Sequence, residues 1–142
     1  MMKNADIDEL LKRIGRDNRL LEIADDYLPV EASWQCGNCW TFAKALQRFL
    51  DRGKLWAIAF TDGGGLNASH VMLKIGNRFY DSLGVWTMRA AIQEHNSIFG
   101  NEIAVQMCPL HKCDCEDIGQ LPSNTCIDKM ATRMREILNE VS

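Results

Sequence analysis

Three side chains of the types that carry out nucleophilic catalysis follow one another along the chain, namely Cys39, His70 and Asp81. A thiol nucleophile needs a base, and the base needs a partner that orients it. Cys39 precedes Phe42 by three residues and Leu46 by seven, so it lies on the apolar stripe of a predicted helix. It projects from the first turn, where unpaired backbone N–H groups and the helix dipole favour a thiolate. The pattern therefore indicates a nucleophilic cysteine.

A predicted β-hairpin brings the other two side chains together. The dipeptide Gly76-Asn77 is typical of a two-residue turn, and it joins the strand that begins at His70 to the strand that carries Asp81. In the register set by this turn, the two residues are diagonal neighbours on one face, with backbones about 7–8 Å apart. A loop with an odd number of residues would place them on opposite faces, so the prediction depends on the register.

The segment around the cysteine also resembles a known active site. Cys36 to Trp40 reads CGNCW, which is similar to the C-G-[SA]-C-[WY] signature of papain-like cysteine proteases. With His70 and Asp81 following in order, the chain resembles the compact core of the papain-like superfamily, which includes transglutaminase-like enzymes, cell-wall peptidases and small deamidases. The resemblance covers roughly residues 34–86 and implies a small antiparallel sheet packed against helices.

The resemblance also implies roles for individual residues. The second cysteine of the signature is the nucleophile, so Cys39 takes that role, with His70 as base and Asp81 as its partner. Gln35 is the one candidate for the glutamine that donates to the oxyanion, although it stands closer to the nucleophile than in papain, and Asn38 replaces Ser or Ala. The implied reaction is acyl transfer at an amide bond of a protein or peptide, as proteolysis, deamidation or transglutamination, with no required cofactor.

The predicted elements would position these residues in an α+β domain, because helices come first and strands follow, with one more helix among them. Helices are predicted at 7–14, 18–28, 39–50 and 88–95 and from Ser123 or Asn124 to Val141, and strands at 54–61, 70–75, 78–83 and 102–107. A flexible loop is predicted at 62–69 and an irregular segment at 108–124. We expect a single domain of residues 1–142, made of N-terminal helices (1–33), a catalytic core (34–107), and a Cys-rich loop with a C-terminal helix (108–142).

Composition restricts the classes of partner. The 142 residues are 46% hydrophobic and 25% charged, which suits one compact domain. No apolar run approaches the ~20 residues of a membrane span, and a net charge of -3 does not favour nucleic-acid binding. Because the N-terminus is charged and lacks the apolar core of a signal peptide, we expect a cytoplasmic protein or one exported by a signal-independent route.

The six cysteines leave alternatives open. Cys36 and Cys39 could form a thioredoxin-like redox pair, although the strand that should precede such a pair is weak. A structural zinc site is a second alternative, and its candidate ligands are Cys108, His111, Cys113, Cys115 and Cys126. A third is an inactive papain-like fold used only for binding. Trp40 and Trp86 are candidates for lining a substrate cleft, whereas His95 and His111 are predicted to lie on the surface.

Overall fold

The computed structural model describes residues 2–14, 17, 19–20, 22–23, 39–101, 103–115 and 123–140. Five strands form one antiparallel sheet in the order β4-β3-β2-β1-β5. The strands are β1 (Lys54–Asp62), β2 (Gly65–Ile75), β3 (Arg78–Asp81), β4 (Gly84–Trp86) and β5 (Val105–Pro109). The helices are α1 (Asn4–Ile14), α3 (Cys39–Leu50), α4 (Met88–Phe99) and α5 (Asn124–Asn139), with a short 3₁₀ helix η1 (Leu110–Lys112) after β5.

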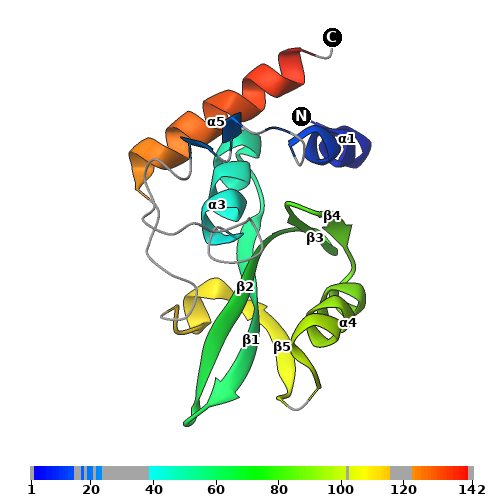
Figure 1. Ribbon diagram of the computed structural model, residues 1–142, viewed down its shortest axis with the longest axis vertical. Helices are drawn as coiled ribbons and strands as arrows, with labels where there is room; N and C mark the ends of the chain where they lie inside the picture. The colour runs from blue at the N-terminus through cyan, green and yellow to red at the C-terminus, as the bar shows by residue number, and fades with distance from the viewer. Residues whose placement is uncertain are drawn as a thin grey trace.

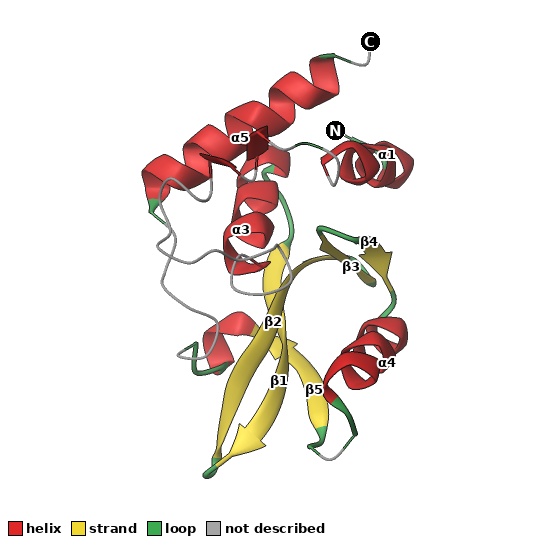
Figure 2. Cartoon of the chain, viewed as in Figure 1, coloured by secondary structure: helices red, strands yellow, loops and turns green. Residues whose placement is uncertain are grey.

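Helices cover both faces of the sheet, as Figures 1 and 2 show. Leu73 of β2 packs in a core cluster with α1, α3 and α5, whereas its neighbour Met72 packs in another cluster with Ala91 of α4. Successive residues of a strand point to opposite faces, so α4 lies on the face away from the other three helices. The predicted α+β class with a small antiparallel sheet is therefore confirmed among the described residues.

The helix that begins at Cys39 forms as predicted and is held by its apolar stripe. Phe42 and Leu46 are fully buried in the cluster shared with α1 and α5. The helix ends at Leu50, and the chain then turns through Gly53, which has a φ of 90°. A Cβ at this glycine would stand 2.9 Å from the carbonyl oxygen of Lys74, so β2 runs against the backbone here. The predicted end of the helix at Leu50 is confirmed, and the residue directly after it, Asp51, has a left-handed φ of 53°.

The prediction of a flexible loop over 62–69 is wrong. β1 continues to Asp62, which pairs with Gly65 at the start of β2. The turn between them is Gly63-Gly64, whose φ angles of 62° and 94° are both positive. Two positive φ angles are what a tight I′-type hairpin turn requires, and glycine adopts them without steric cost. The glycines therefore close a long hairpin instead of opening a loop.

The predicted hairpin between β2 and β3 is confirmed in its turn and its register. Lys74 pairs with Phe79 and Ile75 with Arg78, so the turn has two residues. Gly76 has a φ of 60°, as the first turn position of a II′ hairpin requires. β3 is shorter than predicted, because the chain turns again after Asp81 and returns as β4.

The remaining boundaries differ modestly from those predicted. The first helix begins three residues early, α4 extends to Phe99, and β5 runs two residues into the segment expected to be irregular. Ser123 caps α5 by accepting a hydrogen bond from the backbone N–H of Cys126 at 3.1 Å. The helix predicted at 18–28 and the end of α5 at Val141 lie largely outside the described residues. None of the helices described is long and apolar enough to cross a membrane.

Candidate functional site

The central feature of the site is a buried histidine–aspartate pair. His70 of β2 and Asp81 at the end of β3 are 9% and 5% exposed. His70 Nε2 lies 2.9 Å from Asp81 Oδ2. The predicted diagonal placement on the β2–β3 hairpin therefore brings the two side chains into a direct hydrogen bond.

The turn between β3 and β4 fixes the carboxylate of this pair. Asp81 Oδ1 accepts a hydrogen bond from the backbone N–H of Leu83 and a second from the indole Nε1–H of Trp86, both at 2.9 Å. Both oxygens of the Asp81 carboxylate therefore have hydrogen-bond partners. These bonds hold Oδ2, the oxygen that faces His70 Nε2, in one orientation. Trp86, predicted only as a cleft residue, thus positions Asp81.

Cys39 approaches the same histidine from α3. It is the first residue of that helix, is 4% exposed, and packs in a cluster with Ala57 and Val71. The thiol of Cys39 lies close enough to His70 to raise the pKa of its imidazole. Because His70 Nε2 is bonded to Asp81, Nδ1 is the ring nitrogen that remains for the thiol of Cys39.

The charge state of His70 follows from these neighbours. Burial alone lowers the pKa of His70, but the hydrogen bond that His70 donates to the Asp81 carboxylate, together with the nearby Cys39, outweighs burial and raises the pKa to about 9. His70 is therefore an imidazolium at neutral pH, placed between a carboxylate and a thiol. Strongly perturbed pKa values of this kind cluster at functional sites.

A β-bulge in β2 determines where His70 points. Ile58 of β1 pairs with His70 and Ala59 pairs with Ala68, so Ser69 is an extra residue without a partner on β1. Bulges re-aim side chains next to active sites. Here both Ser69 and His70 line one cavity on the α4 side, although successive residues of a regular strand would face opposite ways.

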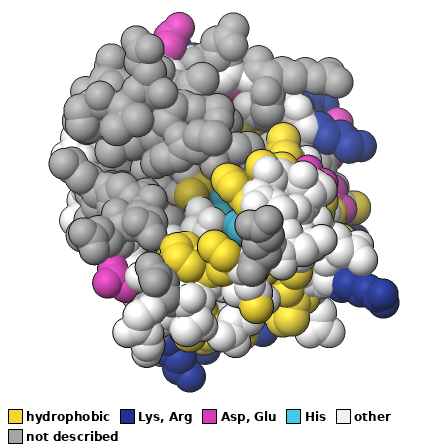
Figure 3. Space-filling view, turned by 60° about the horizontal axis from the view of Figure 1, so that its bottom comes forward, with side chains coloured by type: hydrophobic (Ala, Val, Ile, Leu, Met, Phe, Trp, Pro, Cys, Tyr) yellow, Lys and Arg dark blue, Asp and Glu magenta, His cyan; other side chains and the backbone are white. Residues whose placement is uncertain are grey.

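That cavity has a volume of about 140 Å³ and brings a second histidine to the site. His95 of α4 is 9% exposed, and its Nε2 lies 2.8 Å from Ser69 Oγ. In Figure 3, histidine side chains lie in a hollow flanked by hydrophobic side chains. The prediction that His95 lies on the surface is wrong, although its position four residues after Ala91, on the buried stripe of α4, is a signal for burial.

The other predicted site residues either lie apart from the His70–Asp81 pair or fall outside the residues that the structure describes. Gln35 and Cys36 fall outside the described residues, so neither the oxyanion role of Gln35 nor a redox pair of Cys36 with Cys39 can be placed. Trp40 is half-buried and packs against the Cys39 cluster. His111 is exposed on η1, as predicted.

The later cysteines divide between two regions. Cys108 and Cys113 place their sulfur atoms 2.7 Å apart, whereas Cys126 is buried with Met130 in the core shared by α3 and α5. Burial raises the pKa of the thiols of Cys115 and Cys126, and burial with the bond to Cys108 raises the pKa of Cys113 to about 12. Within the described part of the chain, no three His, Cys, Asp or Glu side chains group as metal ligands. The five proposed zinc ligands are thus not brought together there.

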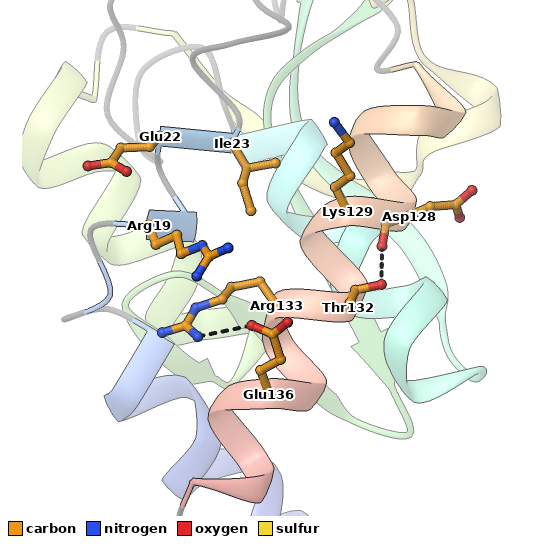
Figure 4. Close-up of a pocket in the computed structure, with 8 residues that line it drawn as sticks. All are labelled: Arg19, Glu22, Ile23, Asp128, Lys129, Thr132, Arg133 and Glu136. Atoms are coloured by element: carbon orange, nitrogen blue, oxygen red, sulfur yellow. Dashed lines mark hydrogen bonds and ion pairs between the residues drawn. The ribbon is translucent and has the colours of Figure 1, made fainter.

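A second cavity, of about 510 Å³, lies beside α5 and is shown in Figure 4. Its lining mixes charges of both signs, and Arg133 bonds to Asp17 and Glu136 at 2.7 and 3.1 Å. Cys39, His70 and Asp81 are not part of this lining. The ion pairs of Arg133 connect the N-terminal segment to α5, which is a structural role.

No protein-family model matches the chain, and comparisons with curated proteins and with solved structures likewise give no match. The class of the protein therefore rests on its own fold and site: an α+β domain in which a helix-terminal cysteine, a histidine and an aspartate meet.

Proposed function

We propose that the protein is a cysteine-dependent acyl-transfer enzyme that acts on amide bonds of a protein or peptide, in the manner of papain-like peptidases and deamidases. The observation that carries the proposal is the position of His70, which bonds to Asp81 at 2.9 Å and interacts with the thiol of Cys39. The burial of all three groups supports it, because charges that are shielded from water interact more strongly.

In the proposed mechanism, His70 Nδ1 holds the proton given up by Cys39, and the thiolate attacks the amide carbonyl carbon. As the carbon–nitrogen bond breaks, Nδ1–H passes this proton to the leaving amine or ammonia, and the acyl group remains as a thioester on Cys39. Nδ1 then takes a proton from water, whose oxygen attacks the thioester. The carbon–sulfur bond breaks and releases the thiolate and a carboxylic acid, which loses its proton to the solvent. An amine in place of water would give transglutamination.

The surrounding groups support these steps. Asp81 accepts the Nε2–H hydrogen bond of His70, so it keeps Nδ1 directed at the thiol and stabilises the imidazolium. Cys39 stands at the N-terminus of α3, where its backbone N–H has no partner within the helix and is a suitable donor to the developing oxyanion. Gln35 remains the predicted second donor.

The reactivity of Cys39 towards iodoacetamide tests the proposal. Alkylation of each cysteine is followed by peptide mass spectrometry from pH 5 to pH 10, with Cys115 as an internal reference because burial raises the pKa of its thiol. We expect Cys39 to react at pH 6, where ordinary thiols are almost entirely protonated. His70→Ala should remove this reactivity, and His111→Ala, which changes an exposed histidine, should not.

Other outcomes of the experiment point to other classes of protein. If Cys39 follows the pH dependence of an ordinary thiol, the enzyme proposal fails and a binding-only fold is favoured. If Cys39 is recovered as a disulfide with Cys36 that exchanges at a defined potential, the redox alternative is favoured. If the purified protein contains zinc, and the cysteines react with iodoacetamide only when that zinc is released, the metal-binding alternative is favoured.

A further inference from the structure

The bulge in β2 changes the alternation of the strand at the place where the strand carries His70. Ala68 and Val71 both pack in the cluster with Cys39, on the face that α3 covers. Two residues separate them, whereas neighbours on one face of a regular strand are separated by one residue. Those two residues, Ser69 and His70, both line the cavity on the other face, beside α4. The bulge therefore accommodates one extra residue directly next to the histidine.

His70 depends on this irregularity because its two partners lie on opposite faces of the sheet. Asp81 lines the cavity on the α4 side, whereas Cys39 packs with Val71 on the α3 side. A side chain of a regular strand points to one face only. At the bulge, His70 Nε2 lies 2.9 Å from Asp81 Oδ2, and the thiol of Cys39 acts on the same ring. The conformation of the bulge thus decides whether the imidazole reaches both groups.

A hydrogen bond to α4 holds the extra residue of the bulge. Ser69 has no partner on β1, but its Oγ lies 2.8 Å from Nε2 of His95, a residue 26 positions further along the chain. The ring of His95 is 9% exposed, and its centroid lies 4.7 Å from that of Phe99. The bond therefore connects the bulge to a side chain that is itself fixed by packing on a helix.

The charge state and the burial of His95 suit a supporting role. Burial, followed by the positive charge of His70, lowers the pKa of His95, so its ring is neutral at neutral pH. A charged His95 would instead repel the imidazolium of His70. Nε2 of His95 is bonded to Ser69, and Nδ1 is inaccessible to solvent. Neither nitrogen of this ring is therefore open to a substrate.

We propose that Ser69 and His95 are positioning residues of the site. Their hydrogen bond holds the bulge of β2 against α4, and the bulge in turn directs His70 at Cys39 and Asp81. The inference rests on the proposed function for the role of His70 as the base that serves the thiol. It adds that the reactivity of the thiol depends on a contact on the far face of the sheet.

Two variants of Ser69 in the full-length protein test the proposal. Ser69→Ala removes the hydroxyl, whereas Ser69→Thr keeps it on a side chain that suits a strand. The readouts are the rate of Cys39 alkylation at pH 6 and the pKa of His70, followed by NMR of its ring protons. We expect Ser69→Ala to slow alkylation about 2- to 10-fold, the effect of one neutral hydrogen bond, and to lower the pKa of His70. Ser69→Thr should restore both values, and wild-type values in Ser69→Ala would overturn the proposal.

A double-mutant cycle tests whether the two residues act through their shared bond. His95→Leu removes Nε2 and keeps an apolar side chain in the buried position. In that background, Ser69→Ala should have little further effect on Cys39 alkylation, whereas independent effects that multiply would overturn the proposal. The control is Ser97→Ala on the exposed surface of the same helix, where Ser97 Oγ donates to the carbonyl oxygen of Glu94. This control should leave both readouts unchanged.

Urea unfolding establishes that each variant is folded under the conditions of the assay. If Ser69→Ala does not fold, His95→Leu provides the same test, because the pKa of His70 should fall there too and a wild-type pKa would overturn the proposal.

The outcome is separate from that of the proposed function. A lower pKa of His70 in Ser69→Ala, in a protein whose wild-type Cys39 reacts as an ordinary thiol, would retain the positioning role and reject the enzyme. An activated Cys39 that reacts equally fast in wild type and Ser69→Ala would retain the enzyme and reject the positioning role.

Discussion

Replacing Asp81 by asparagine removes a negative charge from the site and leaves the size of the side chain almost unchanged. Oδ1 of Asp81 accepts hydrogen bonds from Leu83 N–H and Trp86 Nε1–H, whereas Oδ2 faces His70 Nε2. The amide oxygen of an asparagine would remain with the two donors. Its NH₂ group would then face His70 Nε2, so Nε2 must become an acceptor and the ring proton moves to Nδ1. Because Nδ1 is then protonated in the neutral ring, it can no longer accept a proton from Cys39.

The magnitude follows from the bond that is lost. A hydrogen bond to a charged group contributes about 1.5–3 kcal/mol, which corresponds to a factor of about 10–100 in an equilibrium constant. We therefore expect Asp81→Asn to lower the pKa of His70 and to slow the alkylation of Cys39 at pH 6 by about 10- to 100-fold. Turnover of an amide substrate should fall at least as much, because the wrong tautomer cannot act as a base.

The assay is the pH profile of Cys39 alkylation, with Asp128→Asn as the control because Asp128 is exposed and lies outside the site. The indole N–H signal of Trp86 reports whether the turn keeps its structure in the variant. A wild-type pH profile in Asp81→Asn would refute the reasoning, since it would mean that Asp81 does not set the charge of His70.

Three further predictions concern stability, each measured by urea unfolding. The pKa of His70 is raised from 6.5 to about 9. The charge of His70 therefore stabilises the fold fully below pH 6.5, and this contribution is lost as the pH rises through about 9. The free energy of unfolding of wild type relative to His70→Ala should fall by ~3 kcal/mol between pH 6 and pH 10. Gly53→Ala should lower the free energy of unfolding by more than about 1 kcal/mol, because φ is 90° and the new Cβ meets the Lys74 carbonyl at 2.9 Å. The control Gly65→Ala should have little effect, because no atom lies within 4 Å of its Cβ. Equal effects of the two substitutions would contradict this reasoning. Ser123→Ala should cost about 1 kcal/mol through loss of the cap of α5, and no change would mean that the cap is dispensable.

Local sequence patterns were sufficient for much of the fold around the site. The apolar spacing after Cys39 predicts α3, and Gly76-Asn77 predicts the register that brings His70 to Asp81. Both signals act over a few residues: a helix needs its stripe, and a two-residue turn fixes the pairing of the strands that it joins. The glycines at 63–65 were misread because one run of glycine suits either a loop or a tight hairpin turn.

The sequence by itself therefore determined the order and spacing of Cys39, His70 and Asp81 and the hairpin that pairs the last two. The tertiary structure alone decided how these residues are surrounded. The bulge at Ser69 arises from pairing with β1, and the hydrogen bond between Ser69 and His95 arises from packing of α4 on β2. Both depend on contacts between segments far apart in the chain, and no local pattern encodes such contacts because they form only when the sheet and its helices assemble.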